Sequence, residues 1–223
     1  MPRQAQGRWP EQGQFPWLDQ EGCRLPADST ARSLIRRLVA AVEPGDRQEE
    51  DERQWMLDWI DSGVQLFRLA KPASPPQHLA VYSILIDAPT RSIMIVWHVL
   101  AQAWLFPGGH VDDLEDPRAS VVRELAEELQ IAPAFHPEFG DDPFFLTVTQ
   151  TRGADSHTDV TLWFVFQTDR DDPMTPDERE FGEVLWVPID DLTAWPDGVF
   201  DPGLERFLEK LTARLGPKAL LAR

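Results

Sequence analysis

The sequence has a single cysteine, a shortage of basic residues and no long apolar run. Because Cys23 is the only cysteine in 223 residues, no disulfide can form within the chain, which is typical of a reducing compartment. No segment approaches the roughly 18 apolar residues of a membrane span, and the first residues lack the apolar core of a signal peptide. We therefore expect a soluble cytoplasmic protein with no membrane partner.

Lysine and arginine number 21 against 38 aspartates and glutamates, so the formal net charge is -17 at pH 7. This charge disfavours non-specific binding to nucleic acid backbones or anionic membranes, and we expect no nucleic-acid partner. An acidic protein still binds a polyphosphate when a divalent metal supplies positive charge. The composition is therefore compatible with a small phosphorylated ligand.

The N-terminal part is expected to consist of an arm and a helical cap over residues 1–70. Residues 1–26 contain several aromatic side chains but too few apolar residues for a core of their own. Helical spacing of apolar residues predicts one helix from 28 to 42 and another from 48 to 60. Whether these helices contact a substrate or form an ordinary helical hairpin stays open at this point.

The pattern changes to β-type from residue 78 onward, so we expect a second domain over residues 71–223. A turn of helix is predicted at 189–192, and an amphipathic helix at 202–215. The predicted strands are 78–87, 92–98, 144–151, 158–168 and 183–187. Together these elements predict an α/β fold, in which a mixed sheet lies between helices.

The chain is organised around residues 108–131, where a Gly-Gly turn leads through an acidic loop into a helix. Asp116 is a good N-cap and Pro117 suits the first helical position, so the helix is predicted to begin at Pro117. At about 100° per residue, one face of this helix is apolar. The opposite face is predicted to present three carboxylates, those of Glu124, Glu127 and Glu128. Crowded oxygen ligands without a Cys or His set suit Mg²⁺ or Mn²⁺ rather than zinc.

These residues resemble the Nudix box of the Nudix hydrolases. Gly109, then Glu115 after five residues, then Arg123-Glu124-Leu125-Ala126-Glu127-Glu128-Leu129-Gln130-Ile131 after seven more, follow the box. Gln130 stands where the family has glycine, which normally closes the helix in a left-handed conformation. We therefore expect a longer or differently ended helix here. The resemblance implies a Nudix-type α/β/α sandwich over roughly residues 78–192.

The resemblance also implies roles for individual residues. Glu124 and Glu128 match the carboxylates that bind the divalent ion, with Glu127 assisting and the carbonyl of Gly109 joining the coordination sphere. Arg123 matches the arginine that orients the box carboxylates through charge-assisted hydrogen bonds. Glu115 is expected to support the loop rather than perform chemistry. The cofactor implied is Mg²⁺ or Mn²⁺.

Other candidate residues lie outside the box. The general base is either a box glutamate or an acid of the loop 175–183, where we favour Glu178 or Glu180. His110 in the glycine turn is a candidate phosphate contact, and His157 near Asp159 is a candidate loop contact. Stacking of a base is considered for four aromatic residues, although each is also a candidate for the core: Trp104, Phe145, Trp163 and Trp186.

Three functions compete at this stage. The first is a Mg²⁺- or Mn²⁺-dependent hydrolase that cleaves a diphosphate linkage in a nucleoside diphosphate derivative, such as a nucleotide, nucleotide sugar or ADP-ribose-like molecule. The second is a Nudix-fold nucleotide-binding or regulatory module without turnover, which has no need of the box acids. The third is an isoprenoid diphosphate isomerase, which is disfavoured because Cys23 lies far from the box. The resemblance also allows a homodimer.

Overall fold

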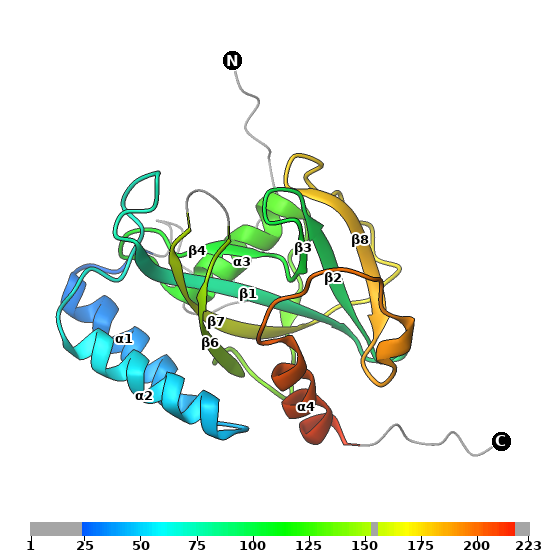
Figure 1. Ribbon diagram of the computed structural model, residues 1–223, viewed down its shortest axis with the longest axis horizontal. Coiled ribbons are helices and arrows are strands. Elements are labelled where there is room, and N and C mark those ends of the chain that lie inside the picture. Colours follow the sequence, from blue (N-terminus) through cyan, green and yellow to red (C-terminus); the bar gives the residue numbers. More distant parts are fainter. Residues whose placement is uncertain (1–23, 153–155, 217–223) are drawn as a thin grey trace.

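The computed structural model describes residues 24–152 and 156–216 (Figure 1). Cys23 and the aromatic residues of the predicted N-terminal arm lie outside the described residues. Within the described part of the chain, no helix is both long enough and apolar enough to cross a membrane.

The described chain begins with two helices, which form a hairpin at one side of the sheet (Figure 1). They are α1 (Asp28–Ala41) and α2 (Arg47–Asp61), close to the predicted bounds. The side chain of Asp46 caps α2 by accepting a 2.8 Å hydrogen bond from the backbone N–H of Glu49. Both helices bury apolar side chains in the same core as one face of the sheet, so the hairpin is packed against the rest of the molecule.

The centre of the molecule is a mixed sheet of eight strands. Its main path runs β3-β2-β1-β7-β5, with β4 paired to β1, β6 to β7 and β8 to β2. Among the strands of the described residues, β1 and β7 are the only pair that is parallel. The strands are β1 (Gln77–Asp87), β2 (Ser92–His98), β3 (Ala103–Leu105), β4 (Gly108–His110), β5 (Ala134–Phe135), β6 (Phe145–Gln150), β7 (Thr158–Gln167) and β8 (Phe181–Pro188).

Helices cover both faces of this sheet. Helix α3 (Pro117–Glu128) and the hairpin share one apolar core with Leu79 and Val81 of β1. Helix α4 (Leu204–Leu215) shares the other core with Ile84 and Ile86 of the same strand. Because side chains alternate along a strand, β1 contributes to both cores. The predicted α/β fold, with a mixed sheet between helices, is confirmed.

Two predicted boundaries near the C-terminus are wrong. The helical turn predicted at 189–192 is instead a 3₁₀ turn at η1 (Leu192–Ala194). The chain is still extended at Ile189, because its backbone N–H donates to Arg91 O, just before β2, at 2.9 Å. The strand predicted at 183–187 extends over 181–188, since β8 pairs with β2 along its whole length.

The register around β1 brings together residues that are far apart in the sequence. On one side β4 pairs antiparallel, with Gly109 opposite Val81 and His110 opposite Ala80. On the other side β7 pairs parallel, with Asp159 opposite His78. The glycine turn, the start of β1 and the start of β7 therefore meet at one end of the sheet.

Candidate functional site

Helix α3 begins at Pro117, as predicted. The carboxylate of Asp116 accepts a 3.0 Å hydrogen bond from the backbone N–H of Arg118, and proline occupies the first helical position. The Arg118 guanidinium also pairs with Asp116 and with Asp141, at 2.7 and 3.0 Å. The beginning of the helix is thereby fixed to the loop that precedes β6.

Helix α3 ends at Glu128, so the expectation of a longer or differently ended helix is wrong. Gln130 itself adopts the left-handed conformation, with φ of 58°. The backbone N–H of Ile131 then donates to Leu125 O at 3.3 Å, so the chain turns back over the last turn of the helix. Glutamine therefore performs the closing role that glycine has in the box, at the steric cost that a side chain carries in this conformation.

Two of the three predicted acids point at β4 instead of into solvent. Glu128 is 5% exposed and its Oε2 accepts a 3.0 Å hydrogen bond from the backbone N–H of Gly108. A Cβ at position 109 would lie 2.4 Å from Glu124 Oε1, so only glycine allows this carboxylate to approach the strand. Glu127 is different, because its side chain is 60% exposed. The predicted acidic face is thus a buried pair beside one solvated acid.

Arg123 is the cation that holds these acids in place. Its guanidinium donates to Glu115 at 2.9 and 3.0 Å, to Glu124 at 2.8 Å, and to Glu127 at 3.5 Å. It also donates to the carbonyl oxygen of His110 at 3.3 Å, which ties the helix to β4. Glu115 in turn accepts from the hydroxyl of Ser120. This arrangement supports the orienting role expected for Arg123 and the supporting role expected for Glu115.

If both were ionised, the carboxylates of Glu124 and Glu128 would carry more negative charge than the guanidinium of Arg123 offsets. Burial raises the pKa of Glu124 to about 7, although Arg123 acts in the opposite direction. Burial, followed by the nearby carboxylates of Glu124 and Glu180, raises the pKa of Glu128 well above its ordinary value. A divalent cation beside both carboxylates would supply the missing charge, and oxygen donors of this kind suit Mg²⁺ or Mn²⁺. The residues present therefore fit the ion that the sequence motif implies.

The loop before β8 packs on the end of α3 and separates the two base candidates. The backbone N–H of Asp177 donates to Glu128 O at 2.7 Å, and that of Thr175 donates to Leu129 O at 2.8 Å. These bonds place the loop so that the carboxyl of Glu180 reaches that of Glu128. Glu178 is exposed on the outer side of the loop. The geometry favours Glu180 over Glu178.

His110 and His157 lie close together, at the sheet end that also holds the start of β7. Their Nε2 atoms are 3.3 Å apart, and each lies near Asp159 Oδ1, at 3.4 and 3.2 Å respectively. His78, which the sequence analysis did not select, completes the group with its Nε2 3.7 Å from the same oxygen. Only the parallel register of β1 and β7 reveals this fourth member, although the spacing of His157 and Asp159 along one strand is visible in the sequence.

The pKa values of His78 and Asp159 in this group differ from their ordinary values. Burial lowers the pKa of His78 to about 4. Burial would raise the pKa of Asp159, but the imidazoles of His110 and His157 outweigh it and lower that pKa. The group therefore consists of a carboxylate surrounded by three imidazole rings, of which the innermost is neutral.

The structure does not support the predicted stacking role of Trp104. The ring is 5% exposed, packs edge-on against Trp97 with centroids 5.5 Å apart, and lies against Gly198. Phe145 and Trp163 are fully buried in the same core. These rings stabilise the sheet and offer no open face to a base.

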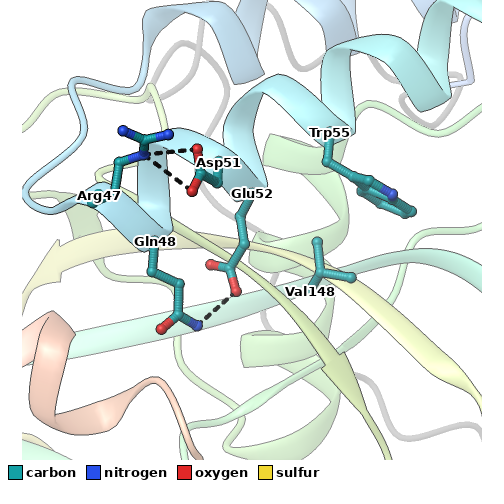
Figure 2. A pocket seen from close by; sticks show the side chains of 6 residues that line it. All are labelled: Arg47, Gln48, Asp51, Glu52, Trp55 and Val148. Carbon is teal, nitrogen blue, oxygen red and sulfur yellow. Dashed lines mark hydrogen bonds and ion pairs between the residues drawn. The ribbon is translucent and has the colours of Figure 1, made fainter.

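A depression is lined by residues of α2 and by Val148 of β6. Figure 2 shows Arg47 paired with Asp51 and Gln48 with Glu52 along α2, while Trp55 and Val148 supply its apolar side. The residues that line it come from α2 and β6, and none of them belongs to the 108–131 segment. The depression is therefore distinct from the carboxylate site.

The sequence matches the family model described as NUDIX domain over residues 76–211. No curated protein matches the chain by sequence. Similar solved structures include the NUDIX domain of Shewanella oneidensis NrtR complexed with ADP ribose, with 20% identity and a TM-score of 0.47, covering 63% of this chain and 89% of that one. A Caenorhabditis elegans Ap4A hydrolase has 17% identity and a TM-score of 0.47, covering 61% and 96%. A MutT NUDIX hydrolase from Burkholderia pseudomallei has 21% identity and a TM-score of 0.46, covering 61% and 98%.

Proposed function

The chain belongs to the NUDIX family, and on this premise we propose that it hydrolyses a diphosphate linkage in a nucleoside diphosphate derivative, with Mg²⁺ or Mn²⁺ as cofactor. The observation that carries the proposal is the charge imbalance on α3, where Glu124 and Glu128 are buried side by side with one guanidinium nearby. A structural helix gains nothing from this arrangement, because buried carboxylates without a counter-charge are destabilising.

The proposed ligands are the carboxylates of Glu124 and Glu128, with the Gly109 carbonyl and the exposed Glu127 at the edge of the site. When bound, the divalent ion neutralises the phosphate oxygens and lowers the pKa of a coordinated water. Arg123 fixes the carboxylate of Glu124 through its 2.8 Å hydrogen bond. The Gly108 N–H does the same for Glu128.

We assign the general base to Glu180, with Glu178 as the second candidate. Glu180 lies at the carboxyl of Glu128, where it would be able to accept the proton of a water held beside a bound ion. Attack of water at phosphorus breaks one P–O bond of the diphosphate link, and the departing phosphate carries the electron pair. The products are two phosphorylated fragments, or phosphate and a shortened nucleotide.

The test is hydrolysis of a substrate panel by the full chain with Mg²⁺ or Mn²⁺. The panel holds nucleoside diphosphate sugars, dinucleoside polyphosphates, ADP-ribose and nucleoside triphosphates. Glu128→Gln should lower kcat/KM by at least about 100-fold, because it removes a proposed ligand of the ion. Glu209→Gln, an exposed acid on α4, is the matched control and should leave turnover unchanged.

Two outcomes would contradict this proposal. Turnover that survives Glu128→Gln undiminished would count against the metal assignment. Tight binding of a nucleotide by the wild type, with no turnover of any panel member, would favour the binding-module alternative. A larger loss of kcat in Glu180→Gln than in Glu178→Gln would support the choice of base.

We also propose that the α1–α2 hairpin is a separate cap ahead of the NUDIX domain, since the family match begins at residue 76. A homodimer is proposed from the resemblance alone, and sedimentation equilibrium of the full chain tests it. The cytoplasmic assignment likewise stays a proposal, supported by the sequence composition.

A further inference from the structure

We propose that His78, His110, His157 and Asp159 form a second metal site, separate from the carboxylates of α3, and that this site takes Zn²⁺. The four residues each offer one ligand atom, and these four atoms all lie within 4.8 Å of one another. The proposal does not depend on the hydrolase function, because it concerns different residues and a different ion.

The distances between ligand atoms suit a tetrahedral ion. With zinc–nitrogen bonds of about 2.0–2.1 Å, the corners of a tetrahedral site lie about 3.3–3.4 Å apart. The Nε2 atoms of His110 and His157 are 3.3 Å apart, and they lie 3.4 and 3.2 Å from Asp159 Oδ1. His78 Nε2 lies 3.7 Å from that oxygen, and the four ligand atoms lie within 4.8 Å of one another, so the ring of His78 has to move inward to complete the fourth corner.

The buried ring of His78 gives an independent reason to place a cation here. Its Nδ1 lies 2.8 Å from Pro75 O, and a carbonyl oxygen only accepts, so Nδ1 carries the proton and Nε2 keeps a lone pair. The side chain is fully buried, and neither its Nε2 nor Asp159 Oδ1 has a hydrogen-bond partner among the described residues. Two acceptors that face each other in the interior are costly unless a cation lies between them.

In His78 and His157, the ring nitrogen that faces away from Asp159 has a hydrogen-bond partner, as is usual for histidines that bind a metal. A metal-ligating histidine usually donates its other ring N–H to a carbonyl or hydroxyl oxygen, which fixes the tautomer. His78 does so to Pro75. The Thr151 hydroxyl, which donates to His157 O at 3.1 Å, lies 3.2 Å from His157 Nδ1 and can accept its proton. Both rings therefore turn Nε2 toward Asp159.

The proposed site lies on the opposite face of β4 from the acids of α3. Gly109 faces Glu124, and because side chains alternate along a strand, His110 projects to the other side. The set contains three imidazoles and one carboxylate, which suits zinc, whereas the all-oxygen set on α3 suits Mg²⁺ or Mn²⁺. Four protein ligands leave no open position, so the ion would be structural, fastening β4 to the starts of β1 and β7.

The side chains of His110 and His157 are 21% and 16% exposed, which provides an entry path for the ion. Full-length protein is stripped with a chelator, dialysed against Zn²⁺ in excess Mg²⁺, and analysed for bound metal per chain. We expect one zinc per chain in the wild type and in Glu128→Gln. We expect at least a 100-fold weaker affinity in His157→Gln and Asp159→Asn.

Cobalt gives a second readout that is independent of activity. Co²⁺ in place of Zn²⁺ should produce the intense visible absorption of a tetrahedral ion in the wild type, and this absorption should be absent in Asp159→Asn. His98→Gln changes a histidine outside the group and should keep both the stoichiometry and the spectrum. Circular dichroism of each variant verifies that it is folded, and His157→Gln, at the rim, is the variant least able to disturb the core.

Four results would overturn the proposal. One is the absence of stoichiometric zinc in the wild type. Another is zinc binding that persists unchanged in both His157→Gln and Asp159→Asn, and a third is zinc binding that is lost in Glu128→Gln, which would place the ion at α3. Tighter binding of Mn²⁺ than of Zn²⁺ would refute the zinc assignment.

Discussion

Buried carboxylates occur in two regions of this molecule, and their surroundings differ. At the contact between α2 and α4, Glu49 is fully buried, and it accepts hydrogen bonds from Lys210 at 2.8 Å and from the Gly45 N–H at 2.7 Å. Arg206 pairs with Asp46 at 2.8 Å and with Glu52 at 3.3 Å in the same interface. On α3, by contrast, Arg123 alone forms salt bridges to Glu115, Glu124 and Glu127. No salt bridge to Glu128 occurs in the described part of the chain.

Burial of an acid therefore does not by itself identify a functional site. Glu49 has a cation of its own, and its burial joins α2 to α4. Glu128 has a backbone N–H and two further carboxylates as neighbours, which raise its pKa in addition to the effect of burial. The balance of charge therefore separates acids that have a cation of their own, such as Glu49, from the acids of α3 that are proposed to bind a divalent ion.

Removing Lys210, the cation that pairs with Glu49, should have the largest effect on stability. In Lys210→Met, Glu49 would be left buried without its partner, and Phe144 O would lose a 2.6 Å hydrogen bond. We expect the free energy of unfolding in urea to fall by about 3–5 kcal/mol. Hydrolysis measured below the unfolding transition should be unchanged, because the α3 acids are untouched.

The double variant Glu49→Gln with Lys210→Met is the control for this prediction. It removes both charges, so most of the lost stability should return. A single Lys210→Met variant that loses less than about 1 kcal/mol would show that the pair is no more important than a surface salt bridge.

The acids of α3 should make the stability of the metal-free protein depend on pH. The folded-state pKa of Glu124 is about 7 against an ordinary value of 4.5, so between these values the folded protein holds a proton that the unfolded chain releases. Stability of the metal-free protein is therefore greatest below pH 4.5 as far as this group is concerned, and it falls as pH rises toward 7. The contribution is about 3 kcal/mol at most.

Urea unfolding of chelator-treated protein at several pH values from 5 to 8 measures this effect. Glu124→Gln carries no titrating group at the position and should flatten the decline. Excess Mg²⁺ should also oppose the decline, because the ion binds the deprotonated carboxylates. A wild-type stability that rises steadily from pH 5 to pH 8 without metal would contradict the charge imbalance.

The residues of the carboxylate site could be predicted because their arrangement is local. Asp116 and Pro117 mark the helix start, and fixed spacing along one helix places Glu124 beside Glu128. The direction of these acids could not be predicted, since it depends on how closely α3 approaches Gly109 of β4. A helical pattern distinguishes two faces, but it does not say which face another strand covers.

The rest of the site depends on contacts between distant segments. His78 joins Asp159 only because β1 and β7 pair in parallel, and the sequence gives no sign of that register. Glu180 reaches Glu128 because the loop hydrogen-bonds to the end of α3. Trp104 has the kind of ring that stacks on a base, yet its position on β3 places the ring in the core. Single-sequence patterns do not encode these pairings.

Changing the residue that ends α3 should alter stability least. It also tests whether this helix end positions Glu124 and Glu128. Gln130 has φ of 58°, where a side chain costs about 1 kcal/mol, so Gln130→Gly should raise stability by about 0.5–1 kcal/mol. Gln102→Gly is a matched control, since Gln102 has φ of 51° in the turn before β3 and should give a similar gain. Turnover should stay within about twofold of wild type in both variants, because Glu128 is held by the Gly108 N–H and not by residue 130. A tenfold change confined to Gln130→Gly would instead make the left-handed helix end part of what aligns the acids.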